Sequence, residues 1–216
     1  MRRALLIVAI AAAAPARAEI DPPRPRPQGP RDSVWVQATA VKPVRDGALA
    51  VQYGDLGGTD VRYLAVQGER RLSRGFAVGI AYGYGALSIE RAPDLPLHLV
   101  RLLSTWSGKG GGLELDGRVW ADALIPERGE TRYQLRTRAR ATLPLGGSRW
   151  RPGVFVADEV FFERGRGLIR NRVTGGVRLH PGGGPVGVDL YWQHSDDRGG
   201  GNQDVAGLAA TWTIGG

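Results

Sequence analysis

Polar and apolar side chains alternate along residues 131–143, TRYQLRTRARATL. The polar positions include four arginines, whereas the positions between them carry no charge; the polar set is Arg132, Gln134, Arg136, Arg138, Arg140 and Thr142. Successive side chains of a β-strand point to opposite faces, and a helix would scatter these arginines around its circumference. The pattern therefore predicts a long strand with one cationic face and one uncharged face.

Similar alternation predicts about eleven strands after residue 32. Their expected ranges are 33–41, 48–54, 60–71, 76–89, 97–107, 112–124, 131–144, 150–163, 168–180, 186–195 and 204–214. Glycine-rich turns separate them, and short links between consecutive strands indicate an antiparallel meander. We expect this all-β chain to close as an up-and-down β-barrel of the transmembrane type, with about 10–12 strands. Because antiparallel closure requires an even number, we favour ten or twelve.

The polar faces of the predicted strands carry complementary charges. Range 112–124 presents Glu114, Asp116, Arg118, Trp120 and Asp122, and range 168–180 presents Arg170, Arg172, Thr174, Arg178 and His180. A hairpin with Asp122 opposite Arg132 would set Asp116 opposite Arg138. The same register sets Glu114 opposite Arg140 and, less favourably, Arg118 opposite Arg136. Opposite charges across a strand pair contribute ~0.2–1 kcal/mol each, so charge favours this register.

Alternation alone does not tell which face is inside, since the apolar face could meet lipid or form a soluble core. Two features favour lipid. Trp and Tyr stand toward the strand ends on the apolar faces, as in an aromatic girdle: Trp106, Trp150, Trp192, Trp212, Tyr82 and Tyr84. Range 76–89 also pairs a large apolar face with a face of only alanine and glycine, which suits a crowded lumen with long arginines opposite.

The first eighteen residues, MRRALLIVAIAAAAPARA, have the pattern of a secretory signal peptide. Arg2 and Arg3 form its charged start, residues 4–14 its apolar part, and Ala16-Arg17-Ala18 a cleavage site of the A-x-A type. We expect residues 19–32 to form an extended tail rich in proline and arginine. The barrel domain is expected at 33–216.

Composition narrows the partners of an exported chain. None of its 216 residues is cysteine, which excludes a disulfide-stapled domain and any thiolate site. The net charge of +8 becomes +5 without residues 1–18, which hold three arginines and no acids. In an exported protein such a surplus points to outer-membrane lipid and lipopolysaccharide, or to small anions in the lumen, and away from nucleic acid.

Five motifs occur in an order that resembles a known family. They are Trp35 in the first strand, RYQLRTRARATLPL at 132–145, VADEVFF at 156–162, LIRNRVTGGVRL at 168–179 and GVDLYWQ at 187–193. Together they resemble an exported, barrel-like bacterial family known as domain of unknown function twenty-four-ninety. The resemblance implies an outer-membrane or periplasmic barrel and implies no activity.

Chemistry-bearing residues do not form a catalytic or metal-binding pattern. Asp158 and Glu159 are adjacent and point to opposite faces, so one is expected in an ion pair inside the barrel. The three histidines are not at ligand spacing from one another, and His194 and Ser195 also point to opposite faces. We therefore assign no catalytic residue, metal ligand or cofactor.

The arginines remain the distinctive constellation, and we expect them to form an ion-paired lattice that lines the lumen. Its expected members are Glu114, Asp116, Arg118, Asp122, Arg132, Arg136, Arg138, Arg140, Glu159, Arg170, Arg172, Arg178 and Asp189. The favoured interpretation is an outer-membrane barrel with a structural or narrow-pore role. Two alternatives are a soluble periplasmic barrel that binds an apolar or anionic ligand and, less favoured, a lipid-modifying enzyme of the outer membrane.

Overall fold

The computed structural model describes residues 33–56, 61–89, 92–146, 149–198 and 201–215, so the expected signal peptide and tail lie outside the described residues. Eleven strands make up the fold: β1 Ser33–Val44, β2 Gly47–Leu56, β3 Val61–Ser73, β4 Phe76–Ile89, β5 Ala92–Gly110, β6 Leu113–Pro126, β7 Arg132–Pro144, β8 Gly153–Glu163, β9 Gly167–Leu179, β10 Val186–Asp197 and β11 Gly201–Thr213. A 3₁₀ turn, η2 Pro181–Gly183, joins β9 to β10. Among the described residues, no helix is long and apolar enough to cross a membrane.

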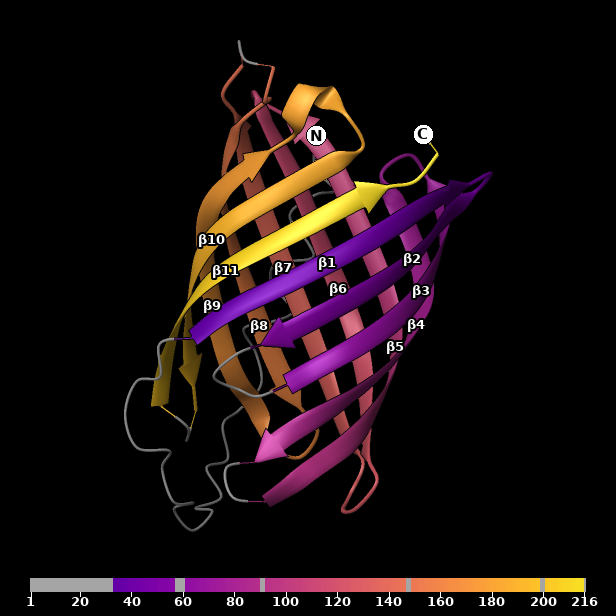
Figure 1. The fold of residues 1–216 in the computed structure, drawn as a ribbon, viewed down its shortest axis with the longest axis vertical. Helices are drawn as coiled ribbons and strands as arrows, with labels where there is room; N and C mark the ends of the chain where they lie inside the picture. Colours follow the sequence, from indigo (N-terminus) through magenta and orange to yellow (C-terminus); the bar gives the residue numbers. More distant parts are fainter. Residues whose placement is uncertain (1–32, 57–60, 90–91, 147–148, 199–200, 216) are drawn as a thin grey trace, which may run out of the picture.

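The strands close into a barrel in which each pairs with its neighbours in sequence. Every pair from β1 to β11 is antiparallel, but the closing pair, β1 with β11, is parallel, with Ser33 opposite Val205 and Val41 opposite Thr213. The two strands lie side by side with their arrowheads at the same end (Figure 1). The barrel fold is confirmed, and the expectation of an even strand count is wrong. A parallel ladder satisfies the edge N–H and C=O groups as well, so an odd number of strands can close.

The polar faces of the strands point into the barrel. Arg101 is 7% exposed, whereas its neighbour Leu102 is 61% exposed. The same alternation places Asp122 and Glu159 inside, and Ile80, Val156 and Leu190 outside. An exterior of large apolar side chains would be costly in water and is typical of a barrel in lipid. The soluble alternative is therefore not favoured.

Aromatic side chains gather on the exterior at both ends of the strands. One exposed set, at the end of the barrel where β11 ends (the upper end in Figure 1), consists of Phe76, Trp106, Trp150 and Trp212. A second set lies toward the opposite, lower end and consists of Tyr53, Tyr82, Tyr84, Tyr133 and Trp192. Aliphatic residues such as Leu102, Leu135 and Leu208 are exposed between them. Two aromatic girdles around an apolar band are characteristic of transmembrane barrels.

The lumen has two unlike halves. Its arginines and acids come mostly from β5 to β10, with Glu69 of β3 as an exception, while the inward positions of β4 are the small residues Ala77, Gly79, Ala81, Gly83 and Gly85. Figure 1 shows β4 on the side of the barrel away from β8 and β9. Small side chains on one wall leave room for the long arginines that extend from the other.

The pairing of β6 with β7 differs by two residues from the expected register. Asp116 lies opposite Arg140, Arg118 opposite Arg138, and Asp122 opposite Gln134. A shift of two preserves the face of every side chain and changes only the partners. Asp122 is instead directly opposite Arg101 on β5, a partner that the β6–β7 hairpin considered alone could not reveal.

Candidate functional site

Glu159 is the centre of the charged lumen. It is 4% exposed and accepts hydrogen bonds from three strands: from Arg118 Nη2 at 2.9 Å, from Arg136 Nη2 at 3.3 Å and from Arg172 Nη1 at 3.3 Å. Strand alternation turns the adjacent Asp158 to the exterior, where it is exposed. Glu159 thus joins β6, β7 and β9 through one carboxylate on β8.

A second buried pair links β5 to β6. Arg101 donates from Nε and Nη2 to the two oxygens of Asp122, at 2.6 and 2.9 Å. Arg136 Nη1 also approaches Asp122, at 3.7 Å. Sequence reasoning missed Arg101 because its inward neighbours on β5 are Leu99 and Leu103, so no polar face stands out there.

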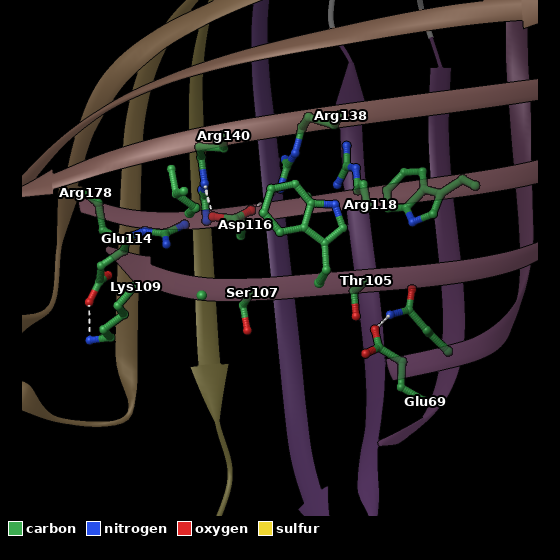
Figure 2. A pocket seen from close by; sticks show the side chains of 16 residues that line it. Glu69, Thr105, Ser107, Lys109, Glu114, Asp116, Arg118, Arg138, Arg140 and Arg178 are labelled. Atoms are coloured by element: carbon green, nitrogen blue, oxygen red, sulfur yellow. Dashed lines mark hydrogen bonds and ion pairs between the residues drawn. The ribbon is translucent and has the colours of Figure 1, made fainter. Parts of the chain in front are cut away.

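Asp116 and Asp189 organise the upper part of the lattice. Asp116 accepts from Arg138 at 3.2 Å and from Arg140 at 2.7 Å. Asp189 accepts two hydrogen bonds from Arg178, both at 2.7 Å, and one from Arg140 at 3.3 Å. Figure 2 shows Arg140 and Asp116 facing each other, with Arg138 and Arg178 nearby.

The remaining expected members lie toward the two ends of the lumen. The sequence predicted that Glu114 would lie opposite Arg140. In the structure Glu114 pairs instead with Lys109, at 2.5 Å. Arg132 lies 3.9 Å from Glu163. Arg170 forms a two-bonded pair with Asp197. Glu163 and Asp197 were missed because each lies at the end of its strand, where alternation is a weak signal.

Aromatic rings separate the arginines from one another. The guanidinium carbons of Arg118 and Arg101 lie 3.6 and 3.7 Å from the centre of the Trp120 ring. Two guanidinium groups cannot share one face of a ring at that distance, so Trp120 lies between them. The guanidinium carbons of Arg136 and Arg172 similarly lie 4.6 and 4.8 Å from the centre of the Phe161 ring. Such cation–π contacts stabilise like charges at close quarters.

Two cavities occupy the lumen. The upper chamber, of about 560 Å³, includes Thr105, Ser107, Glu114 and Arg178 in its lining (Figure 2). The lower chamber, of about 690 Å³, extends from the middle of the barrel to Arg166, in the turn between β8 and β9, and to Arg198, directly after β10. Four residues line both cavities: Arg118, Trp120, Arg138 and Arg140. The arginine–tryptophan layer therefore lies where the two chambers meet.

Neither a metal centre nor a nucleophile–base pair stands out. In the described part of the chain, no group of three or more histidine, aspartate or glutamate side chains is placed to hold a metal ion. Ser195 is buried and accepts from Arg172 Nε at 3.3 Å. His194 points outward, and its Nδ1 lies 2.9 Å from Asp204. His194 and Ser195 therefore lie on opposite faces of β10 and do not form a nucleophile–base pair with each other.

These features define a closed β-barrel with a charged interior and an apolar exterior. No family model matches the chain, and no curated protein matches it. Among solved structures, it is similar to LpxR from Salmonella typhimurium, with a TM-score of 0.51 and 7% sequence identity. The match covers 77% of this chain and 83% of that one. At this identity the likeness concerns the fold alone, which is a closed β-barrel.

Proposed function

We propose that this protein is an outer-membrane β-barrel whose arginine-rich, ion-paired lumen gives it a structural or narrow-pore role. One observation carries the proposal: Arg118, Trp120, Arg138 and Arg140 line both chambers. The lumen thus narrows to a layer of cationic side chains held by acids and an aromatic ring. Rings of arginine select for anions where a pore is open, and close the path where they pack together.

The exterior supports the membrane location. From Phe76 to Tyr84, β4 rises by about 20 Å along the barrel axis, at ~3.3 Å per residue and a tilt of ~40°. Both residues are exposed and belong to opposite aromatic sets. An apolar band of this height is close to the ~25 Å of outer-membrane barrels. Outer-membrane lipid, lipopolysaccharide included, is the partner that we propose for this surface.

The ion pairs favour a lumen that stays in one arrangement. Removing one partner of a buried ion pair typically costs ~3–5 kcal/mol, because the other charge remains without compensation. Glu159 has three such partners and Asp116 has two. Widening the constriction requires these contacts to break together. The geometry thus favours the structural role, and continuity of the two chambers through four residues favours a narrow, anion-preferring path as the second candidate.

Planar-bilayer conductance separates the two roles. We would compare the wild type with the double variant Arg136→Ala/Arg138→Ala and, as a matched control, with Arg62→Ala/Arg70→Ala, which removes two arginines from the exposed positions of β3. A narrow pore requires anion preference in the wild type that falls in the first variant and not in the control. A structural role requires no conductance in the wild type. An ion preference that neither variant changes would contradict both roles for the lattice.

Cell fractionation tests the location independently. We expect the protein in the outer-membrane fraction, released only by detergent. Recovery in the soluble periplasm without detergent would contradict the proposal and revive the soluble, ligand-binding alternative. Membership of the domain of unknown function twenty-four-ninety remains our proposal, carried by the motif order between 132 and 193.

A further inference from the structure

Two groups of lumen arginines differ in how they use their donors, while Arg140 and Arg172 each donate to two different residues. Arg101, Arg170 and Arg178 each donate two hydrogen bonds to a single carboxylate. Such paired contacts match the fork of a guanidinium to the two oxygens of an acid. Each of these three arginines is therefore held in a two-bonded pair with its own acid.

The second group consists of Arg118, Arg136 and Arg138. Each donates one hydrogen bond, to Glu159 or Asp116, although a guanidinium has five N–H donors. Their Nε atoms are buried without an acceptor in the described part of the chain. Their side chains nevertheless remain 18–24% exposed, and all three line the lower chamber. This cationic triad therefore has donors left over and faces a cavity.

The lower chamber as a whole is short of negative charge. Ten arginines line it, against five acids: Asp122, Glu159, Glu163, Asp189 and Asp197. The buried nitrogens of Trp35, Trp120 and Gln193, which also line it, lack acceptors among the described residues. Uncompensated positive charge and unpaired donors in a low-dielectric interior are costly. A bound anion with two or more oxygens would compensate both.

A second wall of the same chamber is apolar. Leu124 lies opposite Leu99, Leu99 opposite Gly83, and Gly83 opposite Ala65, so one row of residues crosses four strands. Leu97 belongs to the same wall, and all five residues line the lower chamber. The three leucines keep part of their surface open inside the lumen. Water alone would leave that surface without a partner, whereas a hydrocarbon chain would cover it.

We propose that the lower chamber binds an anionic amphiphile. Its carboxylate or phosphate group is held by the triad of Arg118, Arg136 and Arg138, and its hydrocarbon part lies on the wall of Leu97, Leu99, Leu124, Gly83 and Ala65. The volume of about 690 Å³ is within the ~300–1,000 Å³ usual for small-molecule pockets. This inference uses the lumen of the proposed function but does not require that ions cross the constriction.

Calorimetric titration of the full chain in lipid nanodiscs, with empty nanodiscs subtracted, tests the ligand class. The probes are octanoate and octyl phosphate for the two head groups, octanol for the tail alone, and inorganic phosphate for the head alone. We expect at least one of the first two to bind roughly tenfold or more tightly than octanol and phosphate, since contacts to charged groups are strong. Equal binding of phosphate would overturn the apolar subsite, and equal binding of octanol would overturn the cationic one.

Two variants locate the site. Arg118→Gln removes one guanidinium group of the cationic triad. Gly83→Leu adds a side chain that fills the lower chamber from its apolar wall. The Cβ atom of a leucine at position 83 fits without a clash, because it would lie 3.4 Å from the Ala65 Cβ and 3.5 Å from the Leu99 Cβ. Arg178→Gln is the matched control, since Arg178 forms a two-bonded pair with Asp189 and does not line the lower chamber.

We expect roughly tenfold weaker binding in the first two variants and unchanged binding in the control. Unchanged binding in both test variants, each verified as folded by its gel mobility without heating, would overturn the site. The result is independent of the conductance experiment. A barrel that conducts nothing can still bind octanoate, and a conducting barrel can fail to bind it.

Discussion

Asp158 and Glu159 are adjacent acids with opposite surroundings. Glu159 is buried among three arginines, whereas Asp158 is exposed between Ala139 and Val173 on the apolar exterior. A carboxylate on the lipid face of a barrel destabilises it, while one that compensates buried arginines stabilises it. Their contributions to stability should therefore have opposite signs.

We expect Glu159→Gln to lower the free energy of unfolding by about 3–5 kcal/mol, because Arg118, Arg136 and Arg172 lose their common anion. Asp158→Asn changes one position along the chain and should leave stability equal or higher. Urea unfolding of the barrel in lipid vesicles, followed by tryptophan fluorescence, measures both. A larger loss in Asp158→Asn would mean that the exterior carboxylate has a partner of its own.

At the scale of the element, aromatic rings lie over glycines of neighbouring strands. Tyr63 is directly opposite Gly54, and Tyr191 is directly opposite Gly207. A Cβ on Gly207 would lie 2.0 Å from Tyr191 Cζ, and one on Gly54 would lie 2.3 Å from Tyr63 Cε1. Both rings line the lower chamber. The missing side chains of the glycines therefore let these rings lie flat along the wall.

Gly207→Ala should lower the free energy of unfolding by about 1–3 kcal/mol, since the added methyl group forces the Tyr191 ring away. Gly175→Ala is the control, because a Cβ there meets no atom within 4 Å. The urea midpoint in detergent micelles measures the difference. Adding Tyr191→Ala to Gly207→Ala should reduce the effect of the glycine substitution, and an effect that stays the same would point to a cause other than the ring.

For the whole molecule, the parallel closure of β1 on β11 is the distinctive feature. Because the chain contains no cysteine, introduced pairs can test it directly. Ala38 and Ala210 are opposite each other in the closing ladder and should form a disulfide as Ala38→Cys/Ala210→Cys. In Ala38→Cys/Ala206→Cys the pair is offset by four residues, roughly 13 Å, and should not.

Mobility on a non-reducing gel after oxidation measures cross-linking. A bond in the offset pair alone would indicate a different register. The absence of any bond in both variants would indicate an open seam. The second outcome would remove the geometric basis for an eleven-strand closed barrel, and the first would change only the register of its closing pair.

The local pattern of the sequence is sufficient to assign the strands and to group the side chains that share a face. Alternation in 131–143 depends only on local backbone geometry, in which neighbouring side chains point to opposite sides. It therefore predicted the β-barrel class, approximate ranges for the eleven strands, and the polar face to which Asp116, Asp122 and Arg140 belong, whereas the expected even count of ten or twelve was wrong. The small-residue face of β4 could likewise be assigned to the lumen, because large apolar and tiny residues alternate there.

The ion-pair partners of the charged side chains, by contrast, depend on how the strands pair in the closed barrel. A strand in a barrel has two neighbours, and a slip of two residues preserves its faces, so local pattern cannot choose a register. Asp122 consequently pairs with Arg101 rather than facing Arg132, and Glu114 pairs with Lys109. Whether the strand count is odd or even depends on how the first and last strands meet. The convergence of Arg118, Arg136 and Arg172 on Glu159 depends on barrel closure, which brings side chains from separate strands to one point.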